Sequence, residues 1–530
     1  MALRPWLTRL SWAVGVAAAV VGLFTVYLRQ SRTQPVNSDG ASIALQAWDM
    51  LHGNLLLRGW NLADVSFYTT ELPQYMIVEA IRGLGSDVVH VCAAMTYTLL
   101  VLLAAWLARG DARGPEGVVR ALLAAGIMLT PQLGHATYTL MLGPDHVGTG
   151  VPLLLTWLIV DRAQHVRPQL QWLAAVAVCV LLAWAAVADL IVEVIGAAPL
   201  LAVCGMRAYQ GLVHHREPLR SRVYELTLAA AAVISVPAAS QATKLIASHG
   251  GWTATPVRTS IAGTSMLSGN ATLTYHGVLE LFGADFTGLQ PGREVLFAGV
   301  HVVGVLLVLA SFVLALRRFF TAELLVQLLA VAIVVNVGAY VFGVQAHDIL
   351  GTREIAAVLP FGAALAGRLL GGPLTKPRRL AVTATAASLG GVLLAGYCAM
   401  LGFNASQPAV PAQDADLTTW LAGRGLSSGL GGYWQANSVT LGSGNTIQVR
   451  AVAVNSGQLT TQAYWEARPS WYDPATAYAN FLVTVNSPAS EQDLGFQWRL
   501  IAMAGRPAHV YQFGRYTIAV WNKNLLGYLH

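Results

Sequence analysis

Two polar runs adjoin hydrophobic segments: Asn37-Ser38-Asp39-Gly40 follows the first such segment, and Gly143-Pro144-Asp145-His146-Val147-Gly148 precedes another. The segments are long enough to cross a bilayer, so we expect both carboxylates at one membrane surface. An unpaired charge at that depth is costly. Acids kept there are therefore expected to bind an ion, a sugar or a phosphate, and we interpret Asp39 and Asp145 as the start of an active site.

The composition is typical of a membrane protein. Of the 530 residues, 55% are hydrophobic and only 11% are charged, which is too apolar for a soluble globular chain. The formal net charge is +6, but the Lys and Arg residues cluster between apolar runs, where they orient helices, so no nucleic-acid partner is expected. The cysteines all lie in apolar segments and none has metal-ligand spacing: Cys92, Cys179, Cys204 and Cys398.

About eleven segments are expected to span the bilayer, since a span needs roughly 20 apolar residues. The first is interpreted as an anchor, because no small-residue cleavage site precedes Arg29. The expected spans are 11–28, 90–108, 121–135, 148–160, 171–188, 190–206, 223–243, 296–316, 322–343, 354–371 and 381–402.

Basic residues fall in alternate loops, which the positive-inside rule assigns to the cytoplasm together with Arg4 and Arg9. An odd number of spans then places the N-terminus inside and the C-terminus outside. The outer side receives the loop 29–89, the Asp145 loop and everything after residue 403. We therefore expect a multi-pass protein of the cytoplasmic (plasma) membrane whose site and C-terminal domain are extracytoplasmic.

The composition changes at Asn404. Residues 1–403 are expected to form the transmembrane domain, and residues 404–530 a soluble mixed α/β domain that follows the linker Gln407-Pro408-Ala409-Val410-Pro411. Within the soluble domain, residues 417–425 have a helical pattern. The runs 446–454, 481–485, 509–513 and 516–521 are rich in strand formers.

The loop 29–89 contains two amphipathic segments. Apolar positions recur at helical spacing from Ala41 to Leu51, and His52-Gly53-Asn54 ends the pattern. Asp39 thus lies at a helix N-terminus, where it either caps the helix or serves a ligand. The aromatic pair Phe67-Tyr68 and the turn Glu71-Leu72-Pro73 follow, and a second helical segment then leads into the next span.

This order of pieces resembles the first extracytoplasmic loop of the GT-C glycosyltransferases, such as protein O-mannosyltransferases and the bacterial aminoarabinose transferase that acts on lipid A. In that superfamily an Asp shortly after the first span is essential and serves as the base for the acceptor, a role that the resemblance implies for Asp39. A second acid opens a later span, as Asp145 does before Val151. The superfamily's Lys-Pro-Pro turn is not reproduced, because Glu71-Leu72-Pro73 has one Pro and no Lys.

The run His347-Asp348-Ile349-Leu350-Gly351-Thr352-Arg353-Glu354 resembles the Arg-containing start of a late helix in the same superfamily. A guanidinium is always charged and binds oxygens in a bidentate way, which suits a lipid-linked phosphate. Arg353 either binds that phosphate or pairs with a neighbouring acid. Further candidates for the donor phosphate are Arg58, Glu71 and His146.

Asp145 and His146 also form a candidate site for a divalent metal ion, with Glu71 as a further ligand, since carboxylates and imidazole bind such ions. One adjacent pair has no ligand periodicity, and a loop histidine such as His146 is more often a hydrogen-bonding residue than a metal ligand. Asp189 and Glu193 are four residues apart and either contact a hydroxyl-rich acceptor or cap a turn. No nucleotide cofactor is expected, because no Gly-rich phosphate loop follows a strand.

The resemblance implies a glycosyltransferase at the outer face of the cytoplasmic membrane. Its donor would be a polyprenyl-phosphate sugar, and its acceptor an envelope glycan, lipid or protein. Asp39 would take the acceptor proton, and Arg353 would stabilise the leaving phosphate. The alternative is a non-catalytic protein of this fold that binds lipid-linked glycan or envelope partners. A transporter ranks last, because the candidate acids cluster at one surface and the sequence shows no repeat.

Overall fold

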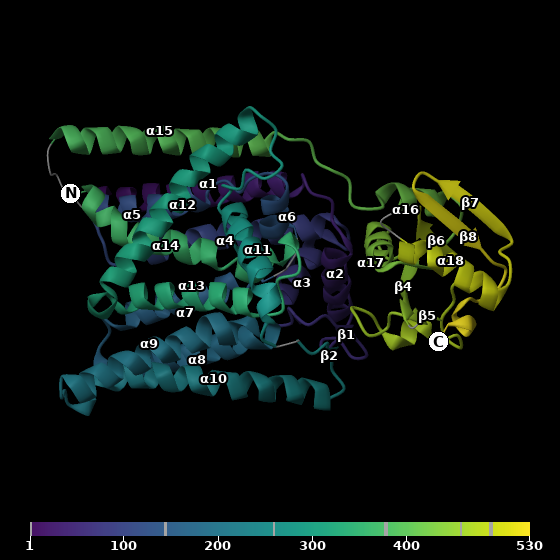
Figure 1. Cartoon of the computed structure of the whole chain (residues 1–530), viewed down its shortest axis with the longest axis horizontal. Coiled ribbons are helices and arrows are strands. Elements are labelled where there is room, and N and C mark those ends of the chain that lie inside the picture. Colours follow the sequence, from purple (N-terminus) through teal and green to yellow (C-terminus); the bar gives the residue numbers. More distant parts are fainter. Residues whose placement is uncertain are drawn as a thin grey trace.

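A computed structural model describes residues 3–142, 146–257, 260–375, 380–455, 458–486 and 491–529. A bundle of long helices carries a smaller sheet-containing domain at one end (Figure 1). In the bundle the long apolar runs form helices, which satisfy every backbone group internally. The helices are α1 (Leu3–Ser31), α2 (Ser38–Leu51), α3 (Glu71–Arg82), α4 (Asp87–Arg109), α5 (Gly114–Met128), α6 (His135–Met141), α7 (Gly150–Ala163), α8 (Gln171–Ala188), α9 (Ala198–Tyr209), α10 (Val223–Ser248), α11 (Thr264–Leu281), α12 (Arg293–Arg317), α13 (Leu324–Phe342), α14 (Val358–Thr375) and α15 (Leu380–Ala405).

Short helical turns join several of these helices. The π-helical turn η2 (Glu193–Ala197) runs directly into α9, and the 3-10 helix η6 (Ile349–Ile355) precedes α14. The remaining short turns of the bundle are η1 (Pro168–Leu170), η3 (Gln210–His214), η4 (Leu219–Arg222) and η5 (Phe319–Thr321).

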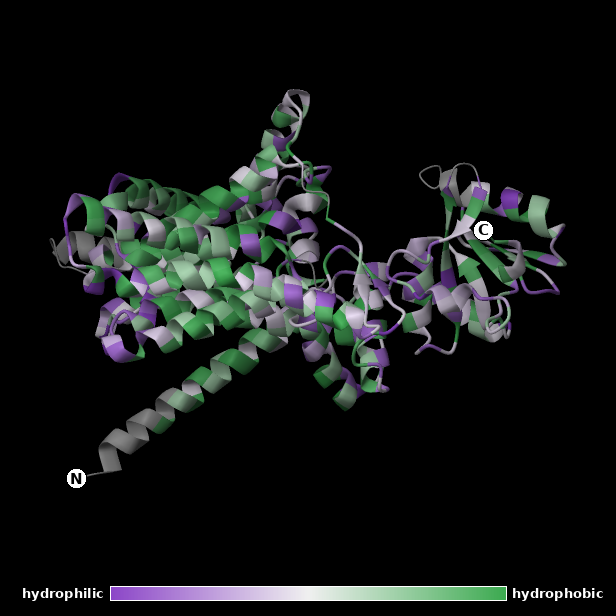
Figure 2. Ribbon diagram, turned by 90° about the horizontal axis from the view of Figure 1, so that it is seen from below, coloured by the Kyte–Doolittle hydropathy of each residue, from purple (hydrophilic) through white to green (hydrophobic). Residues whose placement is uncertain are grey.

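Six helices within the described residues are long and apolar enough to cross a membrane, and a seventh span results if η6 and α14, bent by 50° at their junction, count as one. All eleven segments expected from the sequence overlap helices. However, α5, α7 and α9 have only 15, 14 and 12 residues, too short for this criterion. Hydrophobic residues predominate along the bundle, and hydrophilic residues gather towards its ends (Figure 2).

A buried ion-pair network ties helices together at the end of the bundle away from the C-terminal domain. The Arg368 guanidinium on α14 lies 2.9 Å from Asp161 on α7 and 2.8 Å from Glu323, which precedes α13. The Arg368 and Asp161 side chains are only 8% and 2% exposed. Nearby, Arg162 binds Asp111 at the surface. The loops that contain Asp111 and Arg162 and the loop before Glu323 were expected on one side of the membrane, and they lie together at this end of the bundle.

The C-terminal domain is a six-stranded mixed sheet with the strand order β5-β4-β3-β6-β8-β7. The central strand β3 pairs in parallel with β4 and β6, and the other pairs are antiparallel. Its elements are α16 (Ala415–Gly423), β3 (Ser428–Gly431), α17 (Tyr433–Gly442), β4 (Gln448–Asn455), β5 (Gln458–Thr461), η7 (Pro469–Tyr472), β6 (Phe481–Val485), α18 (Glu491–Ala504), β7 (His509–Phe513), β8 (Tyr516–Val520) and η9 (Leu526–Tyr528).

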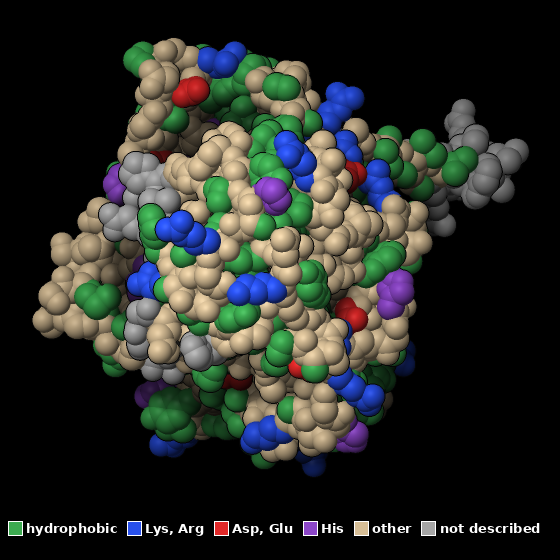
Figure 3. Space-filling view, turned by 90° about the vertical axis from the view of Figure 1, so that its right-hand side faces the viewer, with side chains coloured by type: hydrophobic (Ala, Val, Ile, Leu, Met, Phe, Trp, Pro, Cys, Tyr) green, Lys and Arg blue, Asp and Glu red, His purple; other side chains and the backbone are tan. Residues whose placement is uncertain are grey.

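The C-terminal domain docks on the loop between α1 and α4. The backbones of Asn61 and Ala467 exchange two hydrogen bonds of 2.9 and 3.1 Å, and α17 packs against α2. Asn61 also belongs to strand β1 (Asn61–Leu62), which pairs in parallel with β2 (Thr253–Ala254). On the face of the domain that points away from the bundle, Lys and Arg side chains are scattered and hydrophobic side chains are dispersed among them (Figure 3). The specific contacts of the domain are therefore with the bundle.

Candidate active site

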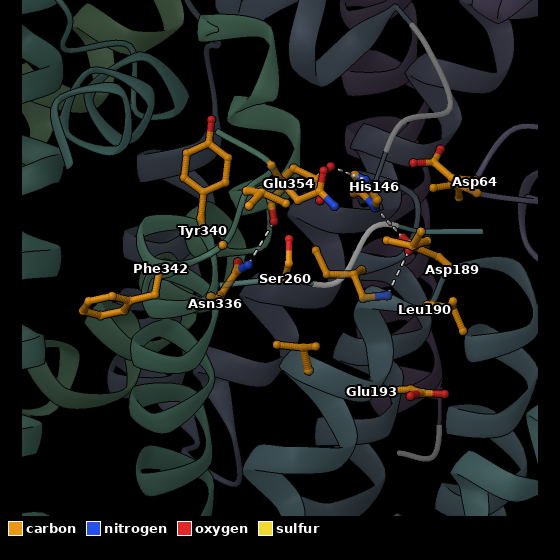
Figure 4. Close-up of a pocket in the computed structure, with 18 of the residues that line it drawn as sticks. Asp64, His146, Asp189, Leu190, Glu193, Ser260, Asn336, Tyr340, Phe342 and Glu354 are labelled. Carbon is orange, nitrogen blue, oxygen red and sulfur yellow. Dashed lines mark hydrogen bonds and ion pairs between the residues drawn. The ribbon is translucent and has the colours of Figure 1, made fainter. Parts of the chain in front are cut away.

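A cavity of about 590 Å³ opens at the end of the bundle that faces the C-terminal domain. The loops after β1 and β2, the turn after α8, the end of α13, and η6 contribute to its walls. In Figure 4, Asp64, His146 and Asp189 lie on one side of the cavity, and Asn336, Tyr340 and Phe342 lie on the other. Among the described residues, the ionisable ones that line the cavity are Asp64, His146, Asp189, Glu193, Tyr340 and Glu354. The apolar lining residues include Leu190, Ile191, Val194, Ile261, Ala339, Phe342 and Val344.

His146 bridges two carboxylates from different parts of the bundle. Its Nδ1 lies 2.8 Å from Oδ2 of Asp189, just after α8, and its Nε2 lies 3.1 Å from Oε1 of Glu354 in η6. The Thr149 hydroxyl and the Ile191 backbone N–H also donate to Asp189, at 2.6 and 3.0 Å. This network fixes the loop before α7 against η6.

The electrostatics of the bridge favour a charged imidazole. Burial by itself lowers the pKa of His146, but the adjacent carboxylates of Asp189 and Glu354 outweigh burial and raise that pKa well above its ordinary value. Both ring nitrogens then carry protons and donate. The imidazolium thus occupies the position between the carboxylates that another cation would otherwise fill.

Glu71 begins α3 and is buried beside this network. Burial raises the pKa of its carboxyl to about 8, so the neutral acid predominates at pH 7. The Thr70 hydroxyl bonds one carboxyl oxygen, and the other lies against Gly148, where a Cβ atom would clash with it. A neutral carboxyl does not repel a phosphate and has a proton to donate to it.

The two arginines expected to bind phosphate lie in different surroundings. Arg353 is half-buried in η6, next to Glu354, and is close enough for its charge to act on Asp64. Burial raises the pKa of Asp64 overall, and the charges of His146 and Arg353 offset part of that rise. Neither arginine is among the described residues that line the cavity, and Arg58 is exposed in the loop between α2 and β1. The structure therefore brings Arg353, but not Arg58, to the ionisable cluster.

Asp39 lies in the first turn of α2 but does not cap it. The cap is Asn37, whose side-chain oxygen accepts from the Gly40 backbone N–H at 3.1 Å. The capping interpretation of Asp39 is therefore wrong, and its carboxylate instead accepts a hydrogen bond from the Tyr433 hydroxyl of the C-terminal domain at 2.6 Å. Asp39 does not line the cavity described above.

Asp145 lies outside the described residues, so its position remains a prediction. The segments that flank the two polar runs do meet. The Ser31 hydroxyl donates to the Met141 carbonyl at 2.6 Å, and the Asn37 amide donates to the Tyr138 hydroxyl at 2.8 Å. The chain therefore brings the first run and the segment that precedes the second run to the same end of the bundle.

The metal prediction is not tested by this arrangement. Within the described residues no three His, Cys, Asp or Glu side chains are placed to hold a metal ion. Both nitrogens of His146 are engaged by carboxylates, and the predicted partner Asp145 is not described.

Several residues at the site carried no signal in the sequence. Asp64 stands alone in an irregular loop, and Glu354 was considered only as a partner of Arg353. Tyr433 and Glu466 contact each other beside Asp39 but follow it in the chain by 394 and 427 residues. Only a contact prediction between distant segments would have joined them to Asp39.

Comparison with known proteins identifies the fold. No family model matches the sequence, and no curated protein matches it in sequence. ArnT from Cupriavidus metallidurans bound to undecaprenyl phosphate matches in structure with a TM-score of 0.56 and 12% identity, over 96% of this chain and 98% of that chain. ArnT in the apo state gives 0.56 and 13% identity, over 97% and 98%.

A second type of membrane enzyme has a similar structure. The Archaeoglobus fulgidus oligosaccharyltransferase in complex with Zn and sulfate matches with a TM-score of 0.50 and 12% identity, over 95% of this chain and 73% of that chain. Across nearly its full length, this chain therefore has the fold of GT-C membrane glycosyltransferases, as its first loop predicted.

Proposed function

We propose that this protein is a glycosyltransferase that uses a polyprenyl-phosphate-linked sugar to modify a cell-envelope acceptor. The observation that carries the proposal is a largely apolar cavity with a cluster of ionisable side chains, in a fold shared with ArnT from Cupriavidus metallidurans, which was solved with bound undecaprenyl phosphate. In this proposal the chain crosses the membrane about eleven times, and its N-terminus lies in the cytoplasm. The cavity and the C-terminal domain then face the outside of the cytoplasmic membrane.

The cavity offers the two kinds of surface that such a donor requires. The apolar wall suits a prenyl chain and the polar side suits a sugar phosphate. Lining carboxylates repel a phosphate, so positive groups have to offset them. Among the described residues, Arg353 and the protonated His146 supply positive charge to this cluster. A divalent ion held with the help of Asp145 is a further proposal, which loss of activity with a chelator would support.

Asp39 is proposed as the general base. It takes the proton from the acceptor hydroxyl while the acceptor oxygen bonds to the anomeric carbon. The bond from that carbon to the phosphate oxygen breaks in the same displacement, and the configuration inverts. The leaving prenyl phosphate keeps the electron pair, and Arg353 and His146 stabilise its charge in a partly water-excluded site.

The test is transfer of labelled sugar from polyprenyl phosphate in membranes that contain Asp39→Asn. We expect transfer to fall by at least about 100-fold, because general base catalysis contributes that much. Asp416→Asn, which changes an exposed acid in the first turn of α16, is the matched control for expression and folding. Undiminished transfer with Asp39→Asn would remove this residue from the mechanism.

One observation favours the non-catalytic alternative: the Asp39 carboxylate is bound by the C-terminal domain and does not line the cavity. In that case the protein would bind lipid-linked glycan or envelope partners. Substitution of Asp39 would then leave the cellular phenotype intact, whereas removal of residues 404–530 would abolish it. Accumulation of an unused prenyl-linked sugar in a deletion strain would instead support the enzyme.

A further inference from the structure

Asp64 lies near the two positive groups that are proposed to hold the donor phosphate. It lines the cavity on the same side as His146 and Asp189 (Figure 4). Burial raises the pKa of its carboxyl, and the positive charges of His146 and Arg353 are close enough to favour its ionised form. A phosphate held by these two groups would therefore have the Asp64 carboxyl as a neighbour.

The loop that carries Asp64 is held at both ends. Before Asp64, strand β1 pairs with β2. After it, the backbone N–H groups of Ser66 and Phe67 donate to the Ala188 carbonyl at the end of α8, at 2.9 and 3.2 Å. The Ser66 hydroxyl also donates to the Val187 carbonyl at 2.8 Å. These contacts fix the Asp64 backbone beside the turn that follows α8.

The turn after Asp64 has an unusual backbone conformation. Phe67 is buried and has φ 53°, in the left-handed region that residues with a side chain seldom adopt. Such conformations persist only where the surroundings hold them, and they cluster at functional sites. The position of Asp64 is thus set before any ligand binds, as electrostatic catalysis requires.

The other acids of the cavity wall are placed differently. Among the described lining residues, Asp189 and Glu354 hold His146 in the bridge. Glu193 lies apart from that bridge, further along the cavity (Figure 4). Asp64 lies beside the bridge, which places it at the phosphate end of the cavity.

A carboxylate at this end opposes binding of the donor, because it repels the phosphate and the repulsion is stronger where water is excluded. The same carboxylate becomes favourable during the reaction. When the bond at an anomeric carbon breaks, the sugar ring passes through a transition state that resembles an oxocarbenium ion and carries positive charge. An interaction that is stronger in the transition state than in the ground state accelerates the chemical step.

We propose that Asp64 is a catalytic residue that contacts the donor sugar and stabilises the positive charge on its anomeric carbon in the transition state. This role rests on the proposed function. The bond from the anomeric carbon to the phosphate oxygen breaks, and the prenyl phosphate keeps the electron pair. The acceptor oxygen bonds to the same carbon, and Asp39 takes the acceptor proton. Asp64 forms no covalent bond and exchanges no proton, so it is a carboxylate before and after the reaction.

The test measures sugar transfer and prenyl-phosphate binding in the same variant. Asp64→Asn keeps the size of the side chain and removes its charge. We expect kcat for transfer to fall by about 100-fold, with the KM for the donor unchanged or lower. Polyprenyl phosphate without a sugar should bind about threefold more tightly, or better, because a repelling charge is gone. The dependence of the thermal unfolding midpoint on polyprenyl-phosphate concentration in detergent gives this affinity.

Asp416→Asn is the control for both measurements. It removes an exposed acid from the first turn of α16 in the C-terminal domain. Transfer and prenyl-phosphate binding should both stay close to the wild-type values.

Two results would overturn the proposal. An undiminished kcat in Asp64→Asn would show that the charge of Asp64 does not act on the transition state. Loss of prenyl-phosphate binding together with transfer would make Asp64 a structural residue of the cavity wall. In both cases the wild type still transfers sugar, so the proposed function stands. If the wild type transfers no sugar, the proposed function fails, and the role of Asp64 fails with it.

Discussion

At the scale of single residues, His146 is the group whose charge most affects the cavity. It is 12% exposed and bridges Asp189, which is 2% exposed, to Glu354. Its loss would leave a buried carboxylate uncompensated. Because such a loss typically costs about 3–5 kcal/mol, the bridge is expected to contribute to folding as well as to ligand binding.

We predict that His146→Gln lowers the thermal unfolding midpoint in detergent and weakens its dependence on pH. The folded-state pKa of His146 is raised above its ordinary value of 6.5. The bridge therefore stabilises fully below about pH 6.5, and its contribution is lost as the pH rises through the folded-state pKa. The wild-type midpoint should fall on the alkaline side, and the variant should show less of this fall. An equal alkaline slope in both proteins would contradict the prediction.

His165→Gln is the matched control for that measurement. His165 is 65% exposed and pairs with Asp111. An exposed pair contributes about 0–1 kcal/mol, so its removal should leave both the midpoint and the slope nearly unchanged.

The sequence identified part of this site because single residue types carry recognisable chemistry. Glu71, His146, Asp189 and Arg353 were singled out, and all lie at or beside the cavity cluster. Arg58 was not distinguishable from them, because a charged residue in a loop has the same pattern whether it faces solvent or a ligand. Asp64 carried no pattern at all.

At the scale of elements, the central strand β3 shows why glycine can be required in a sheet. A Cβ atom on Gly429 would lie 2.2 Å from the ring of Phe481 on the neighbouring strand β6. The sequence Ser428-Gly429-Leu430-Gly431 has low strand propensity, and no strand was expected there. This segment forms a strand because glycine leaves room for the Phe481 ring of the neighbouring strand. Local strand propensity cannot predict such a contact between distant residues.

We predict that Gly429→Ala destabilises the C-terminal domain by about 2 kcal/mol, a typical cost of overpacking. Hydrogen exchange of the sheet amides in the full chain would measure the change. Gly527→Ala is the control, because a Cβ atom there has open space around it. Equal protection in the two variants would show that the Phe481 ring moves aside without cost.

The buried network of Arg368 gives a second prediction at this scale. Arg368→Met removes the partner of the buried Asp161, and we expect a loss of about 3–5 kcal/mol in stability. Thermal unfolding in detergent measures the change. Arg162→Met, which breaks a surface pair with Asp111, should cost less than about 1 kcal/mol. Similar losses in both variants would mean that the guanidinium of Arg368 is solvated in the protein.

The long helices and the clear strands were predictable, and some connections were not. The expected strand 481–485 coincides with β6, because its residues are uniformly strand-forming and buried. By contrast, α11 (Thr264–Leu281) lies inside a segment expected to be a loop. Its Ser, Thr, Asn and Gly residues weaken the helical pattern, and its packing against η6 and α13 compensates.

At the scale of the whole molecule, the proposed orientation is directly testable. We predict that Thr446→Cys, exposed in the C-terminal domain, reacts with an impermeant maleimide in intact cells. A cysteine at the exposed position Arg113 should react only after permeabilisation. The four native cysteines would first be replaced by Ala in both proteins. Labelling of both sites, or of Arg113→Cys alone, in intact cells would contradict the orientation.

The pairing of Asn61 with the C-terminal domain also has a consequence for synthesis. The Asn61 side chain donates to the Ala463 carbonyl, and these two residues are separated by 402 positions. At about 5–20 residues per second, a ribosome takes roughly 20–80 s to cover that interval. In the proposed orientation, the early loop crosses the membrane during this time while its partner Ala463 has not yet been synthesised, so this contact forms only when translation nears the end of the chain.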